Sequence, residues 1–139
     1  TEMPAQRKGR LIMNLMFGNS ISMTSKSLDF LWAKQLTIAH NLSNVDTPGY
    51  KSKYVTFEDE YQNRLKLARA AGNASRTRSI IENSSYTINE TESSARLDDN
   101  NVNADSEEVE MARAQLQYQY VLNAMNSDFT RLRGVIRGQ

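Results

Sequence analysis

The residues from Asn41 to Tyr50, which read NLSNVDTPGY, set the strongest limit on how this chain can fold. Pro48 has no amide donor and disfavours helical backbone at Thr47, the residue before it. Gly49 can adopt the positive φ that a turn after a proline often requires. We therefore expect a helix arriving from the N-terminal side to end near residues 44–45 and to pass directly into a turn.

The segment before this turn has the apolar spacing of an amphipathic helix. Thr24 and Gln35 fill gaps in an otherwise apolar heptad stripe of Ile21, Leu28, Leu31, Ile38, Leu42 and Val45. A helix from about residue 20 to 44 would be ~37 Å long. One narrow stripe cannot form a core alone, so this helix needs a partner. Asn41 and Asn44, three residues apart, share a face of its last turn, where their amides can bond backbone or a neighbouring subunit.

The C-terminal segment has a second, more regular stripe. Its members are spaced alternately by four and three residues: Met111, Gln115, Tyr118, Leu122, Met125, Phe129, Leu132 and Ile136. We expect a helix over 106–136, ~46 Å long, that starts near Asp105 or Ser106. Further apolar residues flank the stripe: Val109, Ala112, Leu116, Tyr120 and Val135. They provide more apolar surface than one partner helix covers, which indicates contacts with neighbouring copies.

These two helices define the predicted fold class and domains. The class is mainly α, with two long terminal amphipathic helices that form an antiparallel or staggered coiled-coil pair and an extended, partly disordered central linker. The predicted parts are a partly disordered N-terminal extension (1–19), an N-terminal axial helix (20–45), a turn and linker with a short helix (46–105), and a C-terminal axial helix (106–139). The 139 residues are only 39% hydrophobic, so we expect a thin core.

The linker has weaker signals. Residues 54–57 favour strand geometry, and a short helix is expected from Glu58 to about Ala71. Residues 74–103 have too few apolar side chains for a separate domain, and we expect them to be disordered in the free monomer. A loose hairpin around residues 84–85 is an alternative.

Charge is segregated along the chain although its net value is only +1. Residues 51–79 have seven basic and three acidic side chains, whereas residues 80–110 have one basic and nine acidic. Such blocks suit contacts between copies, and they equally suit a solvated loop. A small basic cluster at Arg7, Lys8 and Arg10 either is disordered or touches an acidic surface.

The sequence offers little for catalysis, cofactors or metals. There is no cysteine, and His40 is the only histidine, with no triad pattern near it. A calcium-loop spacing occurs at Asp99, Asn101, Asn103, Asp105, Glu107 and Glu110. Ala104 stands where such a loop needs glycine, so we expect no metal site there. We expect no nucleic-acid binding, because Glu58 to Glu60 follow the lysines and aromatic residues after the turn. No apolar run approaches a membrane span.

The asparagine-rich helix end running into Thr-Pro-Gly-Tyr resembles the N-terminal signature of the flagellar axial proteins, the rod and hook family. The likeness continues through residues 51–65 and the helix after Asn101, and covers roughly residues 21–136. Within that family it is nearest the proximal rod members. The resemblance implies a non-enzymatic structural subunit of the bacterial flagellar basal body that assembles through its terminal helices into a torque-transmitting tube around the export channel. It also implies a periplasmic rod location and type III export without a cleaved signal peptide.

The family likeness suggests partners and site residues. The implied partners are other copies of the chain, rod proteins such as FlgC, the rod-base adaptor FliE, and the MS ring and export gate. The expected joint between helix and linker is Asn41, Asn44, Thr47, Pro48, Gly49 and Tyr50. The expected assembly residues are Leu31, Ile38, Leu42, Leu122, Met125, Phe129 and Leu132.

The sequence alone leaves two other classes of protein possible. A sister rod or hook protein of the FlgC type would share the turn, although linker length and residues 115–129 favour the proximal rod type. A coiled-coil adaptor unrelated to flagella would use the same heptads, but it has no need for the Thr-Pro-Gly-Tyr turn.

Overall fold

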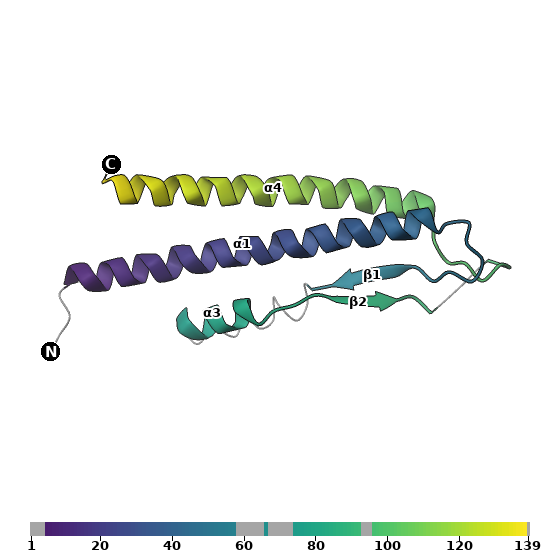
Figure 1. Ribbon diagram of the computed structural model, residues 1–139, viewed down its shortest axis with the longest axis horizontal. Helices are drawn as coiled ribbons and strands as arrows, with labels where there is room; N and C mark the ends of the chain where they lie inside the picture. Colours follow the sequence, from purple (N-terminus) through teal and green to yellow (C-terminus); the bar gives the residue numbers. More distant parts are fainter. Residues whose placement is uncertain (1–4, 58–65, 67–73, 93–95, 139) are drawn as a thin grey trace. The chain divides into compact units, whose positions relative to one another are not determined.

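The computed structural model describes residues 5–57, 66, 74–92 and 96–138 (Figure 1). Its elements in chain order are helix α1 (Ala5–Ser43), strand β1 (Lys53–Thr56), helix α3 (Ala74–Glu82), strand β2 (Thr87–Glu90) and helix α4 (Ala104–Arg137). The protein is therefore mainly α with two long terminal helices, as the heptad stripes predicted. Of the short helix predicted from Glu58 to about Ala71, only residue 66 is described, and it is helical; the rest of that prediction lies outside the described residues.

Helix α1 begins earlier than the sequence analysis predicted. It was expected to start near residue 20, after a partly disordered extension, but helical backbone already begins at Ala5. Gly18 lies inside this helix. A single glycine costs a helix interior only about 1 kcal/mol relative to alanine, which continued helix on both sides can outweigh.

Helix α1 ends at Ser43, one residue before the predicted range, and a tight turn follows. The amide of Thr47 donates to the carbonyl of Asn44 at 3.0 Å, and the amide of Tyr50 donates to the carbonyl of Thr47 at 3.3 Å. Gly49 has a φ of 71°, in the left-handed region where glycine is the least strained residue. The predicted roles of Pro48 and Gly49 in stopping the helix agree with this geometry.

Contacts divide the chain into two units. Unit 1 contains residues 1–26, 58–84 and 122–139, and unit 2 contains residues 27–57 and 85–121. Both long helices contribute to both units.

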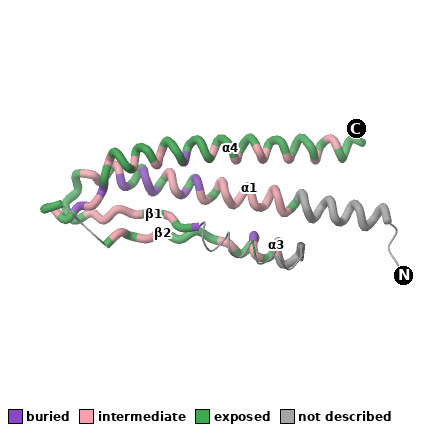
Figure 2. The backbone as a smooth tube through the Cα atoms, turned by 180° about the vertical axis from the view of Figure 1, so that it is seen from behind, coloured by how far each residue is buried: buried purple, intermediate pink, exposed green. Residues whose placement is uncertain are grey.

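In unit 2, the second half of α1 packs against β1 and also bonds to the first half of α4. Phe30 on α1 stacks on Phe57, which follows β1, with ring centroids 5.1 Å apart. The buried residues of this unit lie on this part of α1 and on the segments that contact it (Figure 2). They are Leu31, Ala33, Thr37, Ile38, Asn41, Phe57, Asn100, Val102 and Ala114. Two of the seven predicted assembly residues, Leu31 and Ile38, therefore belong to the core of the single chain.

The two strands form an antiparallel ribbon (Figure 1). Tyr54 pairs with Asn89, and Val55 pairs with Ile88. The strand tendency of residues 54–57 was thus predicted to within one residue, while the partner strand was not predicted. The alternative of a hairpin around residues 84–85 is wrong, because those residues lie between α3 and β2.

In unit 1, helix α3 provides one well-buried side chain, Ile81, which is 1% exposed. The ammonium group of Lys26 donates to the carbonyl of Ser84 at 3.3 Å, which fastens α1 to the end of α3. The hydroxyl of Ser20 donates to the carboxylate of Asp128 at 2.6 Å, which connects α1 to α4. Unit 1 is therefore fastened by polar contacts as well as by apolar burial.

Helix α4 starts at Ala104, with Asn103 as its N-cap residue. The side-chain oxygen of Asn103 accepts from the amide of Ser106 at 3.2 Å, and its carbonyl accepts from the amide of Glu107. Asparagine is among the preferred residues at this position because it satisfies an amide that the helix leaves unpaired. In the described residues, no helix is long and apolar enough to cross a membrane.

Candidate functional site

The turn after α1 is held by the side-chain amide of Asn41, which is 0% exposed. Its nitrogen donates to the carbonyl of Lys53 at 2.7 Å and to the carboxylate of Glu107 at 3.0 Å. Its oxygen accepts from the amide of Lys53 at 2.9 Å and from the hydroxyl of Tyr50 at 3.2 Å. Both donors and both acceptor positions of the amide are thus satisfied. One side chain joins α1, the turn, β1 and α4.

A second buried amide, Asn100, closes the C-terminal end of α1. Its nitrogen donates to the carbonyls of Asn44, Val45 and Thr47 at 2.9, 3.0 and 2.8 Å. Its oxygen accepts from the amide of Val102 at 2.8 Å. These three carbonyls lie after Ser43, the last residue of α1, so this side chain stabilises the turn by donating to its main chain.

Asn101 completes the ribbon beside the turn. Its side-chain oxygen accepts from the amide of Ser52 at 2.6 Å, and its nitrogen donates to the carbonyl of Thr91 at 2.9 Å. The amide of Thr91 donates directly to the carbonyl of Ser52 at 2.9 Å. The asparagine therefore inserts into the ladder at the point where the two strands separate.

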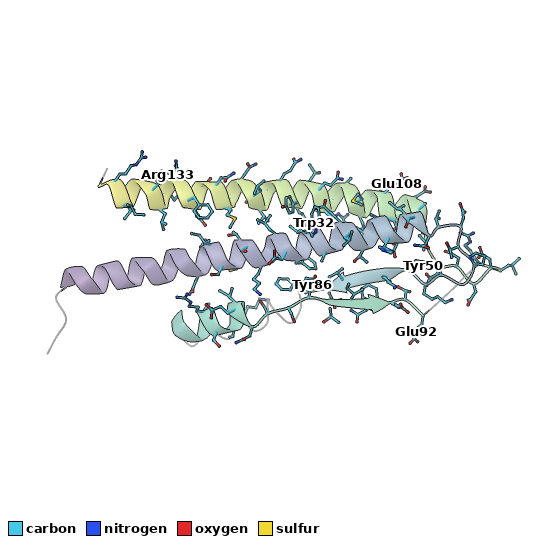
Figure 3. All side chains as sticks on the ribbon, viewed as in Figure 1. Trp32, Tyr50, Tyr86, Glu92, Glu108 and Arg133 are labelled. Atoms are coloured by element: carbon cyan, nitrogen blue, oxygen red, sulfur yellow. The ribbon has the colours of Figure 1, made fainter. Side chains whose placement is uncertain are left out.

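The predicted joint residues all lie in this one network or beside it. Tyr50 lies at the exit of the turn (Figure 3) and donates to Asn41. Asn44 bonds the carbonyl of His40 at 2.8 Å and accepts from the hydroxyl of Thr47 at 3.2 Å. The amide of Gly49 donates to the carbonyl of Asp98 at 2.9 Å. Both predicted asparagine amides are engaged within the chain, so their role as a joint in a larger assembly stays a prediction.

The segregated charge blocks meet each other within the chain. Lys51 pairs with Asp99 at 2.7 Å, and Lys53 pairs with Glu90 at 3.4 Å. Each pair joins a residue of the basic block to one of the acidic block. Neither a contact between copies nor a solvated loop is needed to explain these four charges.

Two glutamates at the start of α4 have opposite pKa shifts. Lys34 on α1 donates to Glu110 at 2.9 Å, and this hydrogen bond holds the pKa of Glu110 below its ordinary value. Burial raises the pKa of Glu107. The hydrogen bond from Asn41 opposes that rise without cancelling it, the charge of Glu110 adds to it, and the charge of Lys34 opposes it. These groups link α1 to α4.

Along α4, residues that are not exposed recur with heptad spacing. They include Met111, Ala114, Tyr118, Val121, Met125, Asp128 and Leu132. Four of the eight predicted stripe residues are shared with this face. Three are displaced by one residue, because Ala114, Val121 and Asp128 occupy the positions expected for Gln115, Leu122 and Phe129. The eighth, Ile136, is exposed. Leu122 and Phe129 are exposed, while Met125 and Leu132 are half-buried. On α1, Leu42 is half-buried.

A second apolar set lies on the opposite side of α4. Val109, Leu116 and Tyr120 recur at helical spacing and are 59%, 69% and 77% exposed. On α1, Trp32 and Leu36 are adjacent on one face and are also largely exposed. Such stripes are unusual on a protein that acts alone, since monomers rarely leave contiguous apolar patches in water.

The described residues contain no group of three or more histidine, cysteine, aspartate or glutamate side chains placed to hold a metal ion. Members of the calcium-loop spacing have other partners. Asn101 bonds β1 and the segment after β2, Glu107 accepts from Asn41, and Glu110 pairs with Lys34.

Two residues near the C-terminal end of the linker, Asn100 and Asn101, stabilise the turn and were not predicted as site residues. Asn100 was not singled out, and Asn101 was considered only as part of a rejected calcium pattern and of the approach to the C-terminal helix. Their signal was the run of three asparagines within Asn100–Asn103, immediately before a helix, since buried amides with paired donors and acceptors suit irregular backbone.

Comparison with known proteins identifies the family. No protein-family model matches the chain. The chain is 31% identical over 127 residues to the flagellar basal body rod protein FlgB of Bacillus subtilis, a match that covers 88% of this chain and 97% of that protein. It is 30% identical over 136 residues to FlgB of Borrelia hermsii, covering 90% of this chain and 100% of that protein. FlgB of Borreliella burgdorferi is 25% identical over 135 residues, covering 87% and 98% respectively. The chain belongs to the FlgB family of flagellar basal body rod proteins.

Proposed function

We propose that this rod protein is a structural subunit of the proximal rod, and that its terminal helices build the wall of a torque-transmitting tube. This proposal rests on the apolar side chains that are exposed on the two long helices. Trp32 and Leu36 on α1 and Leu116 and Tyr120 on α4 leave apolar faces in water although the core face of each helix is already occupied. Neighbouring subunits would bury these faces.

The turn gives the subunit the rigidity that such a role requires. Force that passes from helix to linker has to cross residues 44–52, where a flexible joint would absorb it. The amides of Asn41 and Asn100 bind four carbonyls and one amide of residues 44–53. In our proposal they hold the helix end and the linker as one body during rotation.

The proposed partners follow from the family. They are other copies of the chain, the rod protein FlgC, the rod-base adaptor FliE, and the MS ring and export gate beneath the rod. The subunit would act in the periplasm after type III export without a cleaved signal peptide. It would have no enzymatic activity and no cofactor.

Deletion of the gene in its own bacterium, with re-supply of the wild-type protein, tests this function. We expect the deletion strain to be non-motile and to lack complete rods, and the re-supplied protein to appear in purified basal bodies. Normal flagella in the deletion strain would contradict the proposal.

A second experiment tests whether the fold is completed by assembly. Circular dichroism melts of the purified protein over a hundredfold concentration range should broaden on dilution, because neighbours would offset the entropy of ordering the helices. A sharp melt that does not change with concentration would argue for a self-sufficient domain, as an adaptor would have.

A further inference from the structure

We draw no further inference here: the strongest candidate, the edge of strand β2 that faces away from β1, where Ile88 is 53% exposed, carries none because nothing in the described residues shows which segment or partner would pair with it.

Discussion

The side-chain amide of Asn41 binds both main-chain groups of Lys53, donating to its carbonyl at 2.7 Å and accepting from its amide at 2.9 Å. A side chain at the end of a helix thus takes the place of a neighbouring strand for the first residue of β1. The conformation of the linker is thereby coupled to the last turn of α1.

We predict that Asn41→Ala releases the start of β1. The substitution leaves the amide and carbonyl of Lys53 without their partners, at a penalty of roughly 1–3 kcal/mol for two partly buried backbone groups. Hydrogen exchange of the Lys53 amide should accelerate strongly. Asn44→Ala is the matched control, because Asn44 bonds mainly its own helix end. Unchanged hydrogen exchange of the Lys53 amide would show that Asn41 does not stabilise the start of β1.

Two glycines should respond in opposite ways to alanine. At Gly49 the φ of 71° is unfavourable for any residue with a Cβ, so Gly49→Ala should destabilise the turn by about 1 kcal/mol. At Gly18, inside α1, a Cβ meets nothing within 4 Å, and Gly18→Ala should stabilise the helix by about 0.5–1 kcal/mol. The helix content of each variant at a fixed temperature measures both changes in stability. The same sign for both substitutions would contradict the geometry.

The pH dependence of Glu107 and Glu110 should have opposite signs. Folding raises the pKa of Glu107 above its ordinary value of 4.5, so its ionisation reduces stability as pH rises from 4.5 through the folded pKa. Folding lowers the pKa of Glu110, so its contribution is present above 4.5 and is lost as pH falls through the folded pKa.

Carboxyl NMR titration should therefore give Glu107 the higher pKa of the two. At neutral pH we expect Glu107→Gln to be slightly stabilising and Glu110→Gln slightly destabilising, each by less than about 1 kcal/mol because both sites are partly exposed. Both differences should vanish in acid. A reversed order of the two pKa values would refute the assigned contacts.

The exposed half of the predicted stripe on α4 should matter for assembly. We expect Leu122→Asp to reduce incorporation into the rod more than export from the cell, because a charge on an interface that becomes buried has to be desolvated. Gln119→Asp, at an exposed polar position of the same helix, serves as control. Quantitative blots of basal bodies and of secreted protein separate the two effects. Export lost along with assembly would indicate that the exporter reads this helix.

Much of the fold was accessible from local sequence. Pro48 and Gly49 restrict the backbone directly, so the end of α1 was predicted to within two residues. The resemblance to flagellar axial proteins, carried by the same stretch, was confirmed by full-length relatives. The heptad spacing predicted helix α4, but it did not predict which of its residues pack against the rest of the chain. Leu122 and Val121 are both apolar, so the sequence alone does not distinguish which of them is packed.

The rest depends on contacts between residues distant in sequence. Asn100 reaches Asn44, 56 residues earlier, and no periodicity signals such a pairing. The partner strand of β1 begins at Thr87, in a polar stretch that by itself resembles a linker. Its strand form depends on pairing with β1 and on the inserted side chain of Asn101.

The central claim is that the outer apolar faces of α1 and α4 are buried by other subunits in the rod. Hydroxyl-radical footprinting of Trp32 and Tyr120, read by mass spectrometry, compares the free protein with purified basal bodies. We predict heavy labelling of both residues in the free protein and strong protection in the rod. Equal labelling in the two samples would contradict the account.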